Sequence, residues 1–334
     1  MVAVIKKIIN SKFLSKNKDL TFMLGNDYEI SGSMTSPNLR EALFCSIGEF
    51  IERYELFQYI SSKSFLENGY IETINLYTNQ TKIIENNQNL SRFFYDTCGC
   101  ASHTNSNNAI YNALMEFIER QSFMLTYLTK SNSKKLDFSK LSLQIIPDKY
   151  DFLNFYNISL IDSCFVILAL GFKEQKTYIS LGASKQLYTA ILKSIKEMEQ
   201  LFFYYRREEK CHLYLCDTQS NNSVNDYFNK FMDLPVEKVK AAYSFLNCYD
   251  KIYIEDKDLY LSSNQKDIIQ ELYDRYRIEP LLCKISNKNR VVKIFDINWF
   301  PSINPQTLSK KNKMNIEKIT GKVLDGSCTF IPFP

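Results

Sequence analysis

The amino-acid sequence predicts a mixed α/β fold built around a local unit that occurs three times. Each copy has a few small residues followed by a mostly apolar, helix-length segment with acidic residues at fixed offsets. Similarity of this kind inside one chain is typical of a repeated structural unit. No linker or low-complexity block interrupts the sequence. We therefore expect residues 1–334 to form a single domain, and the 45% hydrophobic composition is enough for a sizeable core.

The repeat consists of an alanine, a glutamate seven residues later, and a glutamate or glutamine three further on. The three copies are Ala42, Glu49 and Glu52; Ala109, Glu116 and Glu119; and Ala190, Glu197 and Gln200. The first two copies continue identically as E-F-I-E-R, ending in Arg53 and Arg120. Small residues precede each copy, at positions 31–33, 99–102 and 182–184, and we expect a tight turn there. The predicted unit is a strand, a small-residue turn and a helix.

The predicted helices are apolar over most of their circumference. In the first, Ser46, Glu49, Glu52 and Arg53 interrupt the central apolar positions, and at about 100° per residue they share one narrow face. A solvated helix face would explain one such stripe, but three stripes in register favour a shared site. Buried carboxylates stay ionised only beside cations, and two arginines cannot balance five glutamates. Mg²⁺, which prefers carboxylate oxygens together with substrate phosphates, would fit this pattern.

Other segments predict a conventional set of elements around these units. Residues 165–172 and 176–184 are two strand-like runs that predict a β-hairpin, and residues 73–84 predict a second hairpin that turns at Asn79 and Gln80. Residues 225–247 and 266–277 have helical patterns, and residues 290–299 predict a strand.

Composition and missing motifs exclude several classes of protein. The 41 basic and 37 acidic residues are interspersed, so the net charge of +4 indicates neither a nucleic-acid partner nor a membrane surface. No segment approaches the roughly 18 apolar residues of a membrane span, and no signal peptide is evident, so we expect a cytoplasmic protein. The nine cysteines follow no disulfide or zinc pattern. Phosphate-loop, dinucleotide and nucleophile-elbow motifs are absent, and two histidines offer little general-base chemistry.

Three segments resemble the ordered motifs of the YcaO family. Residues 46–53 (SIGEFIER) resemble its SxxExxER motif, residues 112–120 (NALMEFIER) are similar to Nx3ExxE, and residues 193–200 (KSIKEMEQ) resemble ExxExxQ. Residues 96–103 (DTCGCASH) are similar to the DTCGC segment of the cyclodehydratase subunit in microcin-B-type thiazole/oxazole synthetases. The Pro-Phe-Pro end, within a tail at residues 329–334, is similar to that of the same subunit. One position departs from the motifs, because Ser194 replaces the first glutamate of ExxExxQ.

The resemblance implies a YcaO-type fold, with antiparallel and mixed sheets whose repeated units line an ATP site with Mg²⁺ ions. It assigns metal binding to Glu49, Glu52, Glu116, Glu119 and Glu197. It assigns nucleotide contacts to Ser46, Arg53, Asn112 and Gln200, with Ser31 or Ser33 as a further hydroxyl contact. The family's late arginine matches Arg290 here, with Lys293 as the alternative. The terminal carboxylate of Pro334 is expected to enter the site and to orient or deprotonate the substrate.

The implied activity is the ATP-dependent conversion of Cys, Ser or Thr in a ribosomal precursor peptide to thiazolines or oxazolines. Because the family-like region fills nearly the whole sequence, a separate protein related to adenylating enzymes is expected to bind the leader peptide. A flavin-dependent azoline dehydrogenase is the other implied partner. A non-catalytic, nucleotide-binding scaffold subunit, a YcaO enzyme that makes thioamides or amidines, and an unrelated α/β protein are the alternatives. Ser194 is the residue that favours the scaffold.

Overall fold

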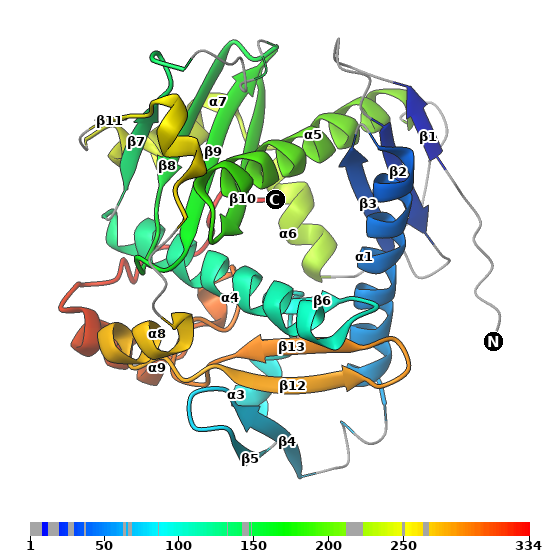
Figure 1. Cartoon of the computed structure of the whole chain (residues 1–334), viewed down its shortest axis with the longest axis vertical. Coiled ribbons are helices and arrows are strands. Elements are labelled where there is room, and N and C mark those ends of the chain that lie inside the picture. The colour runs from blue at the N-terminus through cyan, green and yellow to red at the C-terminus, as the bar shows by residue number, and fades with distance from the viewer. Residues whose placement is uncertain are drawn as a thin grey trace.

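Three sheets and a set of long helices form the protein, as the computed structural model in Figure 1 shows. The structure describes residues 9–12, 20–25, 30–36, 38–62, 65, 69–85, 87–131, 133–141, 147, 149–211, 223–248, 251–262 and 267–334. The first sheet contains β1 (Ile9–Lys12), β2 (Leu20–Gly25) and β3 (Ser31–Ser36), all antiparallel. The expected mixed α/β class is confirmed.

The other two sheets have five strands each. One has the order β10-β9-β8-β7-β11 and is mixed, because β11 pairs parallel to β7. Its strands are β7 (Lys134–Asp137), β8 (Phe152–Asn157), β9 (Phe165–Lys173), β10 (Lys176–Ser184) and β11 (Lys251–Tyr253). The other is antiparallel, with the order β5-β4-β12-β13-β6. Its strands are β4 (Tyr70–Asn75), β5 (Gln80–Glu85), β6 (Cys100–Ser102), β12 (Leu281–Ser286) and β13 (Val291–Phe295).

Three long helices connect the sheets. Helix α4 (Ser106–Thr129) lies between the two five-stranded sheets and contacts β9, β10, β6 and β13 (Figure 1). Helix α1 (Leu39–Ile60) runs from β3 to β12 and β13, and α5 (Leu187–Cys211) packs on β9, β10 and β3. The shorter helices are α3 (Gln88–Ser91), α6 (Ser223–Met232), α7 (Val236–Ala242), α8 (Ile268–Tyr276) and α9 (Lys310–Thr320). None of the helices in the described ranges combines the length and the apolar character that a membrane span needs.

The small residues before each repeat copy are strand residues, so the predicted tight turns are wrong. Residues 31–33 lie in β3, residues 100–102 form β6, and residues 182–184 end β10; only Gly99, with φ of 69°, lies in a turn. A Cβ on Gly32 would lie 2.3 Å from the carbonyl oxygen of Ser46, and one on Gly182 would lie 2.2 Å from that of Ala190. Small residues are therefore needed because each helix backbone packs directly on its strand.

Burial of the long helices differs from the prediction for one of them. Helix α4 buries residues along most of its length, as its apolar composition predicts. Helix α1 instead leaves Leu39, Phe44 and Phe57 exposed, at 51%, 59% and 37%. An apolar circumference is therefore not enough to place a helix inside the core, because burial depends on which elements pack around it.

The smaller predicted elements fall close to their expected positions. Both hairpins are present, and the turn between β4 and β5 contains Asn79 with φ of 55°. The strand expected over 290–299 is shorter, at Val291–Phe295. The single helix expected over 225–247 is broken, because Pro235 begins a new helix and lacks the N–H that a continuous helix needs.

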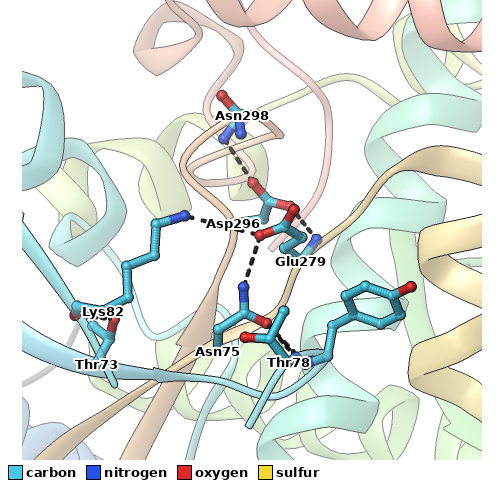
Figure 2. A network of polar contacts seen from close by, with 8 residues as sticks. Thr73, Asn75, Thr78, Lys82, Glu279, Asp296 and Asn298 are labelled. Atoms are coloured by element: carbon cyan, nitrogen blue, oxygen red, sulfur yellow. Dashed lines mark hydrogen bonds and ion pairs between the residues drawn. The ribbon is translucent and has the colours of Figure 1, made fainter. Parts of the chain in front are cut away.

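A polar network joins β4 to the end of β13 (Figure 2). Asn75 Nδ2 donates to Glu279 Oε2 at 2.7 Å, and the Glu279 N–H donates to Asp296 Oδ2 at 2.7 Å. Asp296 also accepts from the Asn298 N–H at 2.8 Å, and burial raises the pKa of this carboxyl group to about 7. The network holds the chain where it leaves β13, one residue after Phe295.

Candidate functional site

Five glutamates from three helices converge on one region between the sheets. Helix α1 contributes Glu49 and Glu52, α4 contributes Glu116 and Glu119, and α5 contributes Glu197. Their charges act on one another across helices: Glu116 raises the pKa of Glu52, and Glu49 and Glu119 raise that of Glu197. The three repeat copies therefore form one site, as the register of the polar stripes predicts.

Burial is the main cause of the raised pKa values in this cluster. Burial first, and neighbouring carboxylates after it, raise the pKa of Glu116 to about 8 and that of Glu197 to about 7. The pKa of Glu52 is raised well above its usual range, again by burial first, and that of Glu119 is also raised. Glu197 nevertheless belongs to the exposed side chains, so protein atoms surround this carboxylate without covering it. The other four glutamates are partly exposed, so none of the five is fully buried.

Basic side chains offset only part of this negative charge. Arg53 Nη2 lies 2.5 Å from Glu49 Oε1. Lys293 is fully buried and donates to the carbonyl oxygens of Asp96 and Cys98 at 2.9 and 2.6 Å. Its charge lowers the pKa of both Glu52 and Glu116.

The two candidates for the late basic residue lie in different places. Lys293 is on β13, inside the site. Arg290 is an exposed residue of the turn between β12 and β13, with φ of 48°. Spacing in the sequence cannot distinguish the two residues. They are only three positions apart, yet one lies in the turn of the hairpin and the other is buried on its second strand.

The expected polar contacts are divided between the site and the helix packing. Ser33 joins two motifs, since its N–H donates to Glu49 Oε2 at 2.5 Å and its hydroxyl to Gln200 Oε1 at 3.4 Å. Asn112 is exposed on α4. The Ser46 hydroxyl is instead buried and donates to the Ala42 carbonyl of its own helix. The side chain of Ser31 lies outside the described residues.

Ser194, the position that departs from the motif, is fully buried where α5 packs on β10. Its hydroxyl donates to the Ile191 carbonyl at 2.8 Å, and its own carbonyl accepts from Ser180 Oγ at 2.6 Å. A glutamate at this position would have to displace that packing. The serine therefore belongs to the helix–strand contact.

Lys193 is a site residue that the sequence analysis did not select. Its Nζ donates to the Ala183 carbonyl at 3.0 Å, and its charge lowers the pKa of Glu119. The Ala183 backbone also hydrogen-bonds to Glu119. The only sequence signal is that Lys193 directly precedes the third motif.

The paired cysteines of the DTCGC segment lie beside the glutamates as protonated thiols. Burial raises the pKa of Cys98 and of Cys100 well above the usual range, and nearby carboxylates raise them further. A thiol becomes an effective nucleophile only as its thiolate. These cysteines therefore pack behind the site and are unsuited to covalent catalysis.

The C-terminal tail ends near the centre of the molecule, beside α6 (Figure 1), and its Phe333 contacts α4, which carries the second motif. Tyr227 and Tyr243 donate to the carbonyl oxygens of Ile331 and Pro332, both at 2.9 Å. The Phe333 ring packs on Phe123 of α4, with ring centroids 4.6 Å apart. Pro334 follows directly and is partly exposed.

The donor set fits Mg²⁺ held jointly with a phosphorylated ligand. Carboxylate oxygens are hard ligands of the kind that Mg²⁺ prefers, and a cation would relieve the repulsion that raises their pKa values. In the part of the chain that the structure describes, no three Asp, Glu, His or Cys side chains form a closed metal-binding group.

A mixed α/β fold whose repeated strand–helix units bring carboxylates together defines a class of protein suited to binding Mg²⁺ and a nucleotide. Residues 75–279, more than half of the chain, match the family model described as YcaO cyclodehydratase, ATP- and Mg²⁺-binding. The chain therefore belongs to the YcaO family, and the family description agrees with the expected cofactors, ATP and Mg²⁺. No curated protein sequence matches the chain.

Solved structures support the fold assignment. The chain is similar to one in the E. coli microcin synthetase McbBCD complex with pro-MccB17 bound, with 17% identity, full coverage of both chains and a TM-score of 0.70. YcaO from Methanopyrus kandleri bound with AMPPCP and Mg²⁺ has 11% identity and a TM-score of 0.66, over 92% of this chain and 89% of that one. At these identities the likeness establishes the fold.

Proposed function

We propose that this protein is the ATP-dependent cyclodehydratase subunit of an azole-forming peptide synthetase. It would convert Cys, Ser or Thr residues of a ribosomal precursor peptide to thiazolines or oxazolines. The observation that carries the proposal is the convergence of five glutamates from the three family motifs. Similarity to a chain of a microcin synthetase complex that holds pro-MccB17 supports a peptide substrate.

The site residues have distinct proposed roles. The carboxylates would hold Mg²⁺ together with the nucleotide phosphates, and the metal supplies charge neutralisation to the phosphates when bound. The proposed metal ligands are Glu49, Glu52, Glu116, Glu119 and Glu197. The proposed nucleotide contacts are Ser33, Arg53, Asn112 and Gln200. Lys293 takes the late basic position that the sequence had assigned to Arg290, and it acts by holding the 96–98 carbonyls behind the glutamates.

The proposed reaction is a phosphoryl transfer followed by an elimination. The substrate thiol or hydroxyl attacks the preceding amide carbon and loses its proton. The former carbonyl oxygen attacks the γ-phosphorus of ATP, and the bond to ADP breaks. The carbon–oxygen bond then breaks with loss of the amide proton, which releases phosphate and leaves a C=N bond in the ring. Such a transfer needs positioning and charge stabilisation more than a histidine base, in agreement with this site.

The terminal carboxylate is the proposed base. Hydrogen bonds from Tyr227 and Tyr243 hold the backbone of the tail, and the rigid Pro332 and Pro334 limit its freedom. The Pro334 carboxylate follows Phe333, which lies against α4. From there it would accept the proton of the attacking thiol or hydroxyl.

The proposed assembly contains several components. The precursor peptide would be delivered by a separate leader-binding protein related to adenylating enzymes, and a flavin-dependent dehydrogenase would oxidise the azolines. This chain would act as one domain, residues 1–334, with residues 329–334 as its tail. We propose that the reaction takes place in the cytoplasm, where ATP is available.

Mass spectrometry of the peptide tests the reaction. The chain, its genomic neighbours, the neighbouring precursor peptide and Mg·ATP are combined. We expect losses of about 18 Da per ring, one water each, that stop without ATP or in a Glu49→Ala variant. Nucleotide binding without any loss of mass would instead favour the scaffold alternative. A mass change other than loss of water would favour thioamide or amidine formation.

A further inference from the structure

Arg120 ends the second copy of the E-F-I-E-R sequence and has buried donors without acceptors. Its Nε and Nη1 atoms are buried and make no hydrogen bond within the described residues. The carboxylate paired with it is that of Glu119, whose Oε1 lies 3.8 Å from Nε, beyond hydrogen-bond distance. Buried charged donors are normally satisfied, because an unpaired one has lost its hydrogen bonds to water without replacement. Such unpaired donors are typical of an anion-binding site.

The matching arginine of the first copy has a different environment. Arg53 makes a close ion pair with Glu49 of its own helix. The two arginines follow identical sequences, E-F-I-E, so the difference arises from the tertiary structure. For Arg120 that environment includes the Phe333 ring of the tail.

Phe333 of the tail packs against the guanidinium of Arg120. The Arg120 Cζ atom lies 5.0 Å from the centroid of the Phe333 ring, which is itself only 3% exposed. A guanidinium in contact with an aromatic ring can still donate from the N–H groups in its own plane. The unpaired Nε and Nη1 of Arg120 are therefore available for hydrogen bonds to an oxyanion.

Arg120 also lies where the nucleotide side and the tail side of the site meet. Its charge lowers the pKa values of Glu116, Glu119 and Glu197, which places it among the carboxylates of α4 and α5. Its other contact is the residue before Pro334. An oxyanion bound there would lie between the proposed Mg²⁺ ligands and the proposed base.

We propose that Arg120 binds the phosphoryl group that is transferred from ATP, and that Phe333 is the positioning residue that orients it. The inference rests on the proposed function and extends it to a phosphate-binding residue and to a role for the tail beyond its terminal carboxylate. It requires the γ-phosphate, so Arg120 should contribute to the binding of ATP and much less to that of ADP.

Calorimetric titration of the full-length chain tests this expectation. Binding of Mg·ADP and of a non-hydrolysable Mg·ATP analogue is measured, and the ratio of the two Kd values gives the preference for the γ-phosphate. We expect Arg120→Lys to reduce this preference about tenfold, which corresponds to about 1.4 kcal/mol, because an ammonium group lacks the planar fork. Phe333→Leu should reduce it in the same direction, and Phe333→Tyr, which keeps a ring, should preserve it.

Phe330→Leu is the matched control. Phe330 belongs to the same tail but packs on Tyr227 and Lys230, with distances of 4.6 Å between ring centroids and 4.4 Å from Nζ to its ring. This variant should leave the preference unchanged. If Phe330→Leu and Phe333→Leu have equal effects, the positioning role is refuted.

Two further outcomes would overturn the assignment of Arg120. An unchanged preference in Arg120→Lys would do so, as would an equal loss of affinity for both nucleotides, which indicates a structural role. Should Arg120→Lys fail to fold, the comparison between the Phe333 and Phe330 variants decides. Failure of the wild-type chain to bind either nucleotide would refute the proposed function itself, and this inference with it.

Discussion

Replacing Glu116 with glutamine should stabilise the nucleotide-free protein while it abolishes the proposed reaction. Burial raises the pKa of this carboxyl group from 4.5 to about 8, so the folded protein at pH 7 must hold a proton that the unfolded chain releases. From 4.5 to pH 7 is roughly 2.5 units at about 1.4 kcal/mol each, which sets an upper limit of about 3.5 kcal/mol. Relaxation and water around a partly exposed side chain would leave about 1–2 kcal/mol, or roughly 1–3 °C in Tm.

The pH dependence gives this prediction a definite sign. The penalty from Glu116 is absent below its unfolded pKa of 4.5 and complete above its folded pKa of about 8. The stabilisation by Glu116→Gln should therefore be clear at pH 7 and nearly absent at about pH 5. Mg·ATP should raise the Tm of the wild type more than that of the variant, because the variant lacks one metal ligand.

Thermal unfolding at both pH values, with and without Mg²⁺ and an ATP analogue, measures these effects. Glu271→Gln is the control, because this glutamate is also buried but accepts from the N–H groups of Asp162 and Ser163 at 3.0 Å and pairs with Arg275 at 2.9 Å. We expect Glu271→Gln to lower the free energy of unfolding by about 1–3 kcal/mol. A lower Tm for Glu116→Gln at pH 7, or an equal response to Mg·ATP, would refute the reasoning.

Three other predictions concern the metal, the packing and the basic residues. Affinity for Mg·ATP should rise between pH 6 and pH 8, because metal binding releases protons from groups such as Glu197, whose pKa is about 7. The rise is up to about tenfold per pH unit for each proton released. A calorimetric affinity that does not change with pH would contradict this. In urea unfolding, Gly182→Ala should lower the free energy of unfolding by about 1–3 kcal/mol, because its Cβ would lie 2.2 Å from the α5 backbone. Gly69→Ala is the control and should change this free energy little, since its Cβ would meet nothing within 4 Å. Lys293→Met should cost about 1–3 kcal/mol by leaving two buried carbonyls unpaired, whereas Arg290→Met on the exposed turn should leave stability and nucleotide affinity unchanged.

Local patterns predicted the elements and the membership of the carboxylate site. The five glutamates could be found because helical spacing places them on one face of each helix, and the register of three copies indicates a shared site. The 165–184 hairpin was predictable because two strand-like runs follow each other across a short turn.

Other features depended on packing that no local pattern contains. The small residues before each helix suit a turn and a close helix–strand contact equally well, and the structure has the contact. Residues Arg290 and Lys293 are both basic and three apart, so only the position of the β12–β13 turn shows which one is buried. The exposed apolar side of α1 likewise follows from which elements surround it.

The sequence by itself determined which side chains share one face of each helix, because residue type and helical period are properties of a contiguous segment. Only the tertiary structure decided what those side chains do together. It brings the carboxylates of three helices close enough to raise one another's pKa values, and it places Phe333, at the far end of the chain, over Arg120. Acidity and orientation depend on desolvation and on neighbours distant in sequence, and these exist only once the chain has folded.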